Sequence, residues 1–222
     1  MKYFLMLILF IPSFSFAQQF RFGFSGSILS DKIIGVDNDT REEGKLVSNT
    51  NFHYGIHFAY LMGSGFQILL DYQNKSYDFD NTQEIITGEE SFSLAKTSIG
   101  MRWIAHPRIA LRLHLNFDED IVFTVDENNQ ALIEPEKIIY PSIFYDQILF
   151  LGGSMYSGFK VGYELGGTGE TIKNRTALQY GLFAVLNAFE INYMIKNITK
   201  ENDTLEFTET ESALNFIYLF RF

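Results

Sequence analysis

The sequence contains no cysteine. The chain therefore has no disulfide framework, no thiol chemistry and no cysteine that could carry a lipid after a signal peptide. Basic residues are also scarce, since 17 lysines and arginines stand against 27 aspartates and glutamates, for a formal net charge of −10. Phosphate binding depends on clustered lysine and arginine, so this balance argues against nucleic acid as a partner.

Long hydrophobic runs are absent beyond the first residues of the chain. Lys2 precedes an apolar run that ends at Pro12, and Ser15-Phe16-Ala17 has the small-x-small pattern at which signal peptidase cuts. A membrane-spanning helix needs about 20 apolar residues, and this run is too short for one. The pattern predicts a cleaved signal peptide over residues 1–17 and one mature domain over residues 18–222.

A mature chain without an apolar helix can enter a membrane only as strands, and only a closed barrel leaves no strand edge unpaired. A lipid-facing strand is apolar on its outer face even where its inner face is polar, which distinguishes such a barrel from a soluble β-sandwich. This alternation recurs in ten segments, near residues 20–30, 51–62, 66–73, 95–103, 109–117, 138–151, 159–165, 178–186, 189–195 and 214–222.

Short turns and long polar connections alternate along the chain. The short turns fall near residues 63–65, 105–108, 152–154 and 187–188, and the long connections near 31–50, 78–91, 118–137, 166–174 and 196–211. Outer-membrane barrels have short periplasmic turns, longer extracellular loops and an even number of strands, whereas a soluble sandwich does not sort its loops by length. We therefore predict an all-β fold, an up-and-down antiparallel transmembrane β-barrel of about ten strands in the bacterial outer membrane. Eight strands are the main alternative, because Pro141 makes the segment 138–151 irregular.

The C-terminus resembles the final strand of bacterial outer-membrane β-barrel proteins. It reads Leu214-Asn215-Phe216-Ile217-Tyr218-Leu219-Phe220-Arg221-Phe222, with alternating apolar residues and a terminal Phe. In that class the barrel assembly machinery reads this strand, so the resemblance implies an assembly signal at Tyr218, Phe220 and Phe222. It also implies outer-membrane lipid and lipopolysaccharide as partners, in the envelope of a Gram-negative cell. The opening Phe22-Gly23-Phe24-Ser25-Gly26 is similar to the first strand of small porin-like barrel domains.

Charged and histidine side chains fall on the inward face of the predicted strands. They form a predicted polar network in the lumen of Arg21, His57, Asp71, Lys96, Arg102, Arg112, His114, Asp146, Lys160, Glu164, Glu190 and Arg221. The turn lengths place His57 opposite Asp71, and Asp146 opposite Lys160. Side chains fill a barrel of about eight strands, whereas wide aqueous channels need about 16. The network favours a plugged lumen and a structural, adhesive or surface-interaction role, with a narrow channel for small solutes or ions as the alternative.

A second alternative is an outer-membrane hydrolase acting on lipid or peptide, because His57 beside Asp71 could serve as an acid–base pair. No serine is placed with this pair as a nucleophile, so we expect no catalytic residues, no cofactor and no metal. Acidic residues crowd the predicted long loops without spelling a twelve-residue calcium loop. We expect these loops to be solvated, with an extracellular ligand at the acidic loops as a further candidate partner.

Overall fold

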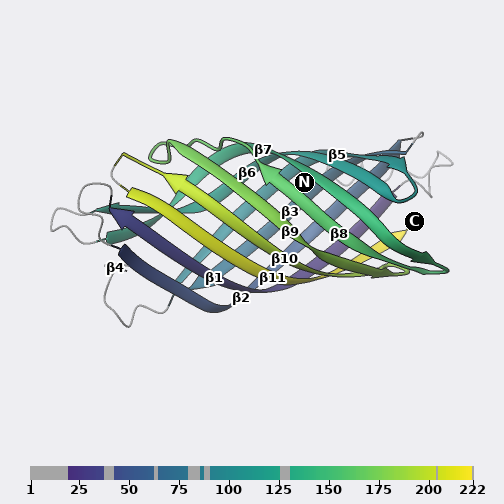
Figure 1. Ribbon diagram of the computed structural model, residues 1–222, viewed down its shortest axis with the longest axis horizontal. Coiled ribbons are helices and arrows are strands. Elements are labelled where there is room, and N and C mark those ends of the chain that lie inside the picture. Colours follow the sequence, from purple (N-terminus) through teal and green to yellow (C-terminus); the bar gives the residue numbers. More distant parts are fainter. Residues whose placement is uncertain are drawn as a thin grey trace, which may run out of the picture.

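Ten long antiparallel strands make up the structure (Figure 1). The computed structural model describes residues 20–37, 43–62, 65–79, 86–87, 91–125, 131–203 and 205–221. The long strands are β1 (Phe20–Asp37), β2 (Glu43–Met62), β3 (Phe66–Asp78), β5 (Ser91–His106), β6 (Ile109–Val125), β7 (Ala131–Gly152), β8 (Met155–Glu164), β9 (Asn174–Leu186), β10 (Phe189–Glu201) and β11 (Leu205–Arg221). The two-residue strand β4 (Ile86–Thr87) pairs in parallel with the start of β7. Within the described ranges, no helix is long and apolar enough to cross a membrane.

The sheet closes on itself. Neighbouring strands follow one another from β7 through β6, β5, β3, β2, β1, β11, β10 and β9 to β8, and β8 pairs again with β7. The first and last strands pair along their whole length, from Arg21 opposite Arg221 to Asp37 opposite Leu205. The predicted ten-stranded antiparallel barrel is confirmed, and the eight-stranded alternative is wrong. The predicted signal peptide, residues 1–17, lies outside the described residues.

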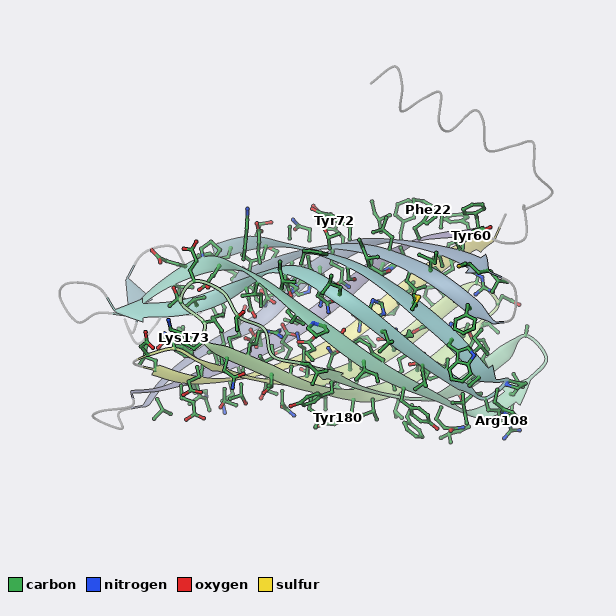
Figure 2. The ribbon with its side chains drawn as sticks, turned by 90° about the horizontal axis from the view of Figure 1, so that it is seen from above. Phe22, Tyr60, Tyr72, Arg108, Lys173 and Tyr180 are labelled. Carbon is green, nitrogen blue, oxygen red and sulfur yellow. The ribbon has the colours of Figure 1, made fainter. Side chains whose placement is uncertain are left out.

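The two ends of the barrel differ in their connections. At one end, here called the short-turn end, successive strands meet in tight turns such as that of Asn187, whose φ of 56° is the left-handed conformation typical of two-residue hairpins. The opposite end, here called the long-strand end, carries the longer connections and the segment 165–173 between β8 and β9. Figure 2 places Arg108 at the short-turn end and Lys173 at the long-strand end.

Most of the predicted long polar loops are strands instead. β1 runs on to Asp37, β6 to Val125 and β10 to Glu201, so much of the segments 31–50, 118–137 and 196–211 belongs to the barrel wall. The prediction fails because it relies on an apolar outer face, which marks only the part of a strand that meets lipid. Backbone pairing continues where the outer face turns polar, since water can meet that face while the ladder hydrogen bonds remain.

The irregular segment near Pro141 is part of β7, the longest strand of the barrel. Pro141 lies just beyond the end of the ladder with β8, and its carbonyl accepts a hydrogen bond from the Leu165 amide at 2.9 Å. Its missing N–H would face the same side, so it falls where the ladder with β8 ends and removes no bond from the ladder with β6. A register shift between Ile148 and Phe150 then interrupts the alternation. Leu149, Phe150 and Leu151 are all exposed as a result, so this part of β7 does not alternate.

An apolar belt surrounds the barrel next to the short-turn end. On β9 the outward residues from Leu178 to Leu186 are apolar, and Leu182 is 65% exposed. This span matches the roughly 9–11 residues with which a tilted strand crosses the core of a bilayer. Phe22, Tyr60, Tyr72 and Tyr180 point away from the barrel wall in Figure 2. So large a continuous apolar surface is the face that a membrane barrel presents to lipid.

A charge placed on this belt tests which face meets lipid. We expect Leu182→Arg to lower the free energy of unfolding by about 2–4 kcal/mol, the cost of a basic side chain near the middle of a bilayer. The matched control is Thr199→Arg on β10, an exposed outward position beyond the belt, which we expect to change stability little. The measurement is urea unfolding of the protein folded into phospholipid vesicles. Equal effects of the two substitutions would contradict this assignment of the belt.

Candidate functional site

A cavity of about 350 Å³ lies in the lumen of the barrel. Ten residues of the predicted polar network line it: Arg21, His57, Asp71, Lys96, Arg102, Arg112, His114, Asp146, Lys160 and Glu190. Glu164 is instead buried among the charges that lie beyond the cavity toward the long-strand end. The side chain of Arg221 lies outside the described residues, as does Phe222. Tyr218 and Phe220 of the predicted assembly signal are exposed on the outer face.

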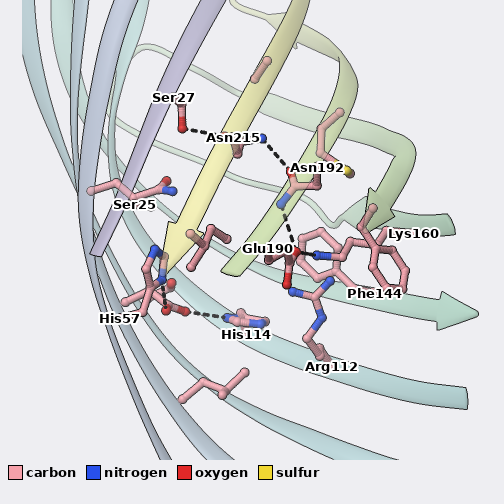
Figure 3. A pocket seen from close by; sticks show the side chains of 18 of the residues that line it. Ser25, Ser27, His57, Arg112, His114, Phe144, Lys160, Glu190, Asn192 and Asn215 are labelled. Atoms are coloured by element: carbon pink, nitrogen blue, oxygen red, sulfur yellow. Dashed lines mark hydrogen bonds and ion pairs between the residues drawn. The ribbon is translucent and has the colours of Figure 1, made fainter. Parts of the chain in front are cut away.

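Two histidines share one carboxylate in the cavity (Figure 3). The strand register puts His57 opposite Asp71, the pairing that the turn length predicts, and their Nδ1 and Oδ1 atoms are 2.7 Å apart. His114 Nδ1 approaches the other oxygen of Asp71 at 3.8 Å. Gly100 lies opposite His114, and a Cβ there would come within 2.8 Å of His114 Nδ1, so this ring position requires a glycine across the strand pair.

Asp146 stands opposite Lys160 in the register, again as the turn length predicts, but it pairs with other cations. Arg112 donates to Asp146 Oδ1 at 2.7 Å, and the Arg102 guanidinium lies 3.6 Å from Oδ2. Lys160 instead donates to Glu190.

From Glu190 a chain of polar contacts crosses three strands. Asn192 donates to Glu190 at 2.9 Å, Asn215 donates to Asn192 at 2.7 Å, and Ser27 donates to Asn215 at 2.5 Å. Figure 3 shows this chain along one side of the cavity. Each of these polar groups is hydrogen-bonded to another inside the lumen, so none of them faces lipid unpaired.

The wall of the cavity is more basic than acidic. Among the described residues it carries seven cations and four carboxylates: Arg21, Lys75, Lys96, Arg102, Arg112, Lys160 and Lys196 against Asp71, Asp146, Glu190 and Glu211. Two aromatic rings of the cavity wall lie beneath cations, with the Arg112 guanidinium 4.8 Å from the Phe144 ring centre and Lys160 Nζ 5.0 Å from that of Phe183. The site therefore combines positive charge with apolar surface.

A layer of buried charges closes the lumen at one end of the cavity, and its members Lys75, Lys196 and Glu211 also line the cavity. This charged layer consists of Asp31, Lys75, Asp118, Asp120, Glu164, Arg175, Lys196, Lys200, Glu209 and Glu211, each less than a tenth exposed. Arg175 is its centre, because it donates to Glu164 at 2.6 Å and to Asp120 at 2.7 Å. The Arg175 guanidinium also lies 4.2 Å from the centre of the Tyr140 ring.

Lysines complete the charged layer. Lys200 bridges Asp120 and Glu209, both at 2.6 Å, and Lys75 donates to both oxygens of Asp118 at 3.1 Å. Buried charges are tolerated when they are paired and hydrogen-bonded, and ion pairs link Arg175, Glu164, Asp120, Lys196, Lys200, Glu209 and Glu211 into one group. Asp118 pairs separately with Lys75, and both carboxylate oxygens of Asp31 lack a hydrogen-bond partner among the described residues.

An apolar cluster fills the lumen at the long-strand end. This apolar cap consists of Leu29, Ile33, Leu46, Tyr77, Phe79, Phe92, Leu94, Ile121, Ile133 and Phe207. The β6–β7 hairpin helps to build it, since this hairpin continues to Val125 opposite Ala131 after β5 has left β6. A second cluster of Val122, Ile138, Tyr140 and Ile172 packs the segment between β8 and β9 against the same hairpin.

Sequence reasoning missed the charged layer because most of its members lie in segments predicted as loops. The signal was present as strand parity. Asp118 and Asp120 continue the inward series of His114 and Asn116 on β6, and the other strands continue in the same way. The solvated acidic loops are accordingly a wrong prediction for four of their residues, since Asp118, Asp120, Glu209 and Glu211 are buried inside the barrel.

The charged layer contains more carboxylates than cations, and this excess of negative charge affects Asp31. Asp31 lies beyond the apolar belt, on the same strand face as Leu29 and Ile33. Its burial, together with the nearby carboxylates of Glu209 and Glu211, raises its pKa well above that of an exposed aspartate. For Asp120 burial acts in the same direction, but Lys200 and Arg175 outweigh it and hold the pKa of that carboxyl well below its ordinary value.

A metal site has no support in the described part of the chain, where no three histidine, cysteine, aspartate or glutamate side chains are arranged to hold an ion. The cavity's polar groups instead suit a ligand that accepts hydrogen bonds from cations.

The chain is similar in structure to several solved bacterial outer-membrane proteins. No protein-family model matches the sequence, and no curated protein matches it. Among solved structures, the outer-membrane protease OmpT of Escherichia coli is 9% identical with a TM-score of 0.45, over 94% of this chain and 99% of OmpT. The β domain of the Bordetella autotransporter BrkA is 11% identical with a TM-score of 0.42, over 91% and 100%. The toluene transporter TodX of P. putida is 8% identical with a TM-score of 0.37, over 96% and 91%.

These similar structures are bacterial outer-membrane β-barrels, and their named activities differ from one another. At this level of similarity none of those activities transfers to this chain.

Arg175 is expected to stabilise the closed lumen strongly. Arg175→Ala leaves Asp120 and Glu164 buried without their shared partner, and breaking a buried pair in this way costs about 3–5 kcal/mol. The control is Lys173→Ala, which removes an exposed ion pair with Asp203 at 3.6 Å and should cost less than about 1 kcal/mol. Urea unfolding in vesicles, followed by the fluorescence of the single tryptophan, compares the two. Similar losses in both variants would show that the charged layer adds no stability.

Asp31 is expected to make stability depend on pH. Because its pKa is raised in the folded state, Asp31 costs stability as the pH rises through that pKa, and this cost is absent below the pKa of the unfolded chain, about 4. Asp31→Asn should therefore unfold at higher urea than the wild type at pH 8, and the difference should shrink at pH 4. Glu206→Gln, on the exposed outer face of β11, serves as the control. A destabilised Asp31→Asn protein at pH 8 would contradict the expectation.

Proposed function

We propose that this chain is an integral outer-membrane β-barrel with a sealed lumen, and that it has a structural, adhesive or surface-interaction role without conduction. The observation that carries the proposal is the charged layer lying directly beneath the apolar cap. Together they fill the lumen at one end with side chains that are bound to one another.

The orientation follows from the general architecture of such barrels. Their short turns face the periplasm and their longer connections face the outside, so the long-strand end would be extracellular. Outer-membrane lipid and lipopolysaccharide would then contact the apolar belt and its outer margin. The barrel assembly machinery remains the expected partner for insertion, through Tyr218, Phe220 and Phe222.

A sealed lumen is supported by the cost of opening it. A path for ions through the charged layer would separate Arg175 from Glu164 and Asp120, which are nearly inaccessible to water. Breaking a buried ion pair costs several kcal/mol because each partner is left as an isolated charge in a medium of low dielectric. The apolar cap adds a second barrier, because it offers an ion no polar group with which to replace its water.

The surface role is supported by the length of the strands. Beyond the apolar belt β1, β2, β6, β7, β10 and β11 continue as paired strands, and the outer face there includes the exposed polar residues Lys32, Thr208 and Thr210. Because side chains fill this extension of the barrel, its outer surface is rigid. A rigid surface lowers the entropic cost of binding a partner. The extracellular ligand predicted for the acidic loops is therefore better sought on this rigid extension.

A narrow channel for small solutes or ions is the alternative to the sealed lumen. The absence of catalysis stays a prediction. The His57–Asp71 pair is present, but a hydrolase would also need a nucleophile within hydrogen-bonding distance of His57.

Planar-bilayer recording tests the sealed lumen. We expect the purified, refolded barrel to insert without discrete conductance steps, because the charged layer and the apolar cap block the path. Heat-modifiable migration on gels confirms beforehand that the inserted protein is folded. Discrete steps whose size changes in Arg112→Ala, but not in the matched variant Arg108→Ala at the exposed short turn, would establish the channel instead.

A further inference from the structure

We propose that the lumenal cavity is a binding site for a small organic anion, a carboxylate carried on a compact apolar or aromatic body. The proposal rests on the proposed function in one respect, because the sealed long-strand end leaves the short-turn end as the entrance. Two arginines, a surplus of positive charge and a neighbouring aromatic surface carry the argument.

Two arginines face each other across neighbouring strands with a single carboxylate between them. Arg102 on β5 is directly opposite Arg112 on β6, and both guanidinium groups reach Asp146. Like charges in opposite positions of a strand pair are destabilising unless a counter-charge lies between them. One carboxylate neutralises only one of the two guanidinium groups.

Among the described residues, the Arg102 guanidinium has unused hydrogen-bond donors, including its buried Nε. Its guanidinium is 3.6 Å from Asp146, which is too long for a hydrogen bond, and within the described part of the chain it donates no hydrogen bond to a neighbouring side chain. A guanidinium offers five N–H groups in a planar fork that matches a carboxylate. About a quarter of the Arg102 side chain is exposed within the lumen, so an incoming carboxylate could reach it.

The remainder of the cavity wall selects for negative charge. Lys75 and Lys196 line the cavity, whereas their main carboxylate partners, Asp118 and Glu164, lie behind them in the charged layer. The seven wall cations are therefore balanced partly by carboxylates that a ligand does not touch. A cleft whose low-dielectric wall carries an excess of one sign of charge concentrates ligands of the opposite sign.

The aromatic groups favour an apolar body on the ligand. Phe144 lies under Arg112 and Phe183 lies under Lys160, while the Tyr156 and Phe183 rings meet edge to face at 6.1 Å. Small-molecule sites combine such apolar surface with a few fixed polar groups and have volumes of about 300–1,000 Å³. A cavity of about 350 Å³ is at the lower end of this range and suits a ligand the size of benzoate.

Isothermal titration calorimetry of the full mature chain, folded in a non-ionic detergent at low salt, tests the site with benzoate as the probe. We expect benzoate to bind and benzamide, its uncharged counterpart of similar shape, to bind much more weakly. Arg102→Gln and Arg112→Gln should each weaken benzoate binding about tenfold or more, because each removes charge-assisted hydrogen bonds. Arg108→Gln, a matched change at an exposed turn, should leave the affinity unchanged.

Asp146→Asn supplies a readout that a merely structural role would not give. It removes the carboxylate that competes for both arginines, so benzoate should bind several times more tightly to this variant than to the wild type. Heat-modifiable migration verifies the fold of every variant. Absence of benzoate binding to the folded wild type, equal binding of benzamide, or unchanged binding in both arginine variants would overturn the proposal. If the barrel shows no conductance and does not bind benzoate, only the anion site is overturned. If it conducts, the sealed lumen is overturned.

Discussion

Backbone hydrogen bonding in the absence of water is the constraint on which the whole structure depends. Inside a bilayer every N–H and C=O must find a partner within the protein, and for strands this requires a sheet without edges. Closure through the β1–β11 and β7–β8 pairs meets the requirement. It also forces every second side chain into a narrow lumen, where polar groups find only one another. The buried charges of this protein are thus a consequence of closing ten strands around a small space.

The lumen changes character along its axis. Near the short turns it holds a cavity with more cations than carboxylates on its wall, then a layer of paired charges, and finally an apolar core typical of a soluble domain. The outer face changes in the opposite sense, from apolar in the belt to polar beyond it. Near the short turns the barrel therefore has the polar interior and apolar exterior of a membrane protein. At the other end it has an apolar interior and exposed polar residues on its exterior. The charged layer lies where the two meet.

Alternation of residue types predicted the closed barrel, its strand number and the short turns, because lipid imposes a strict pattern on the outer face. The same criterion does not detect strands beyond the membrane, so it places Asp120, Lys200 and Glu209 in loops. Register counting from a short turn placed His57 opposite Asp71, since two paired strands share a fixed offset. It could not show that Asp146 prefers Arg112 to Lys160, because side-chain partners also depend on strands further round the barrel. Arg175, which joins the charged layer across three strands, needs the closed structure to be recognised.

The seam between β1 and β11 has a consequence for exchange with the surrounding lipid. Its ladder continues past the belt as far as Asp37 and Leu205, and the apolar cap fastens it from inside through Leu29 and Phe207. Parting the first and last strands sideways would break hydrogen bonds in lipid and expose the cap to water in the same movement. The wall therefore resists lateral opening, and if the lumen is sealed as proposed, a molecule held in it would leave along the barrel axis toward the short turns.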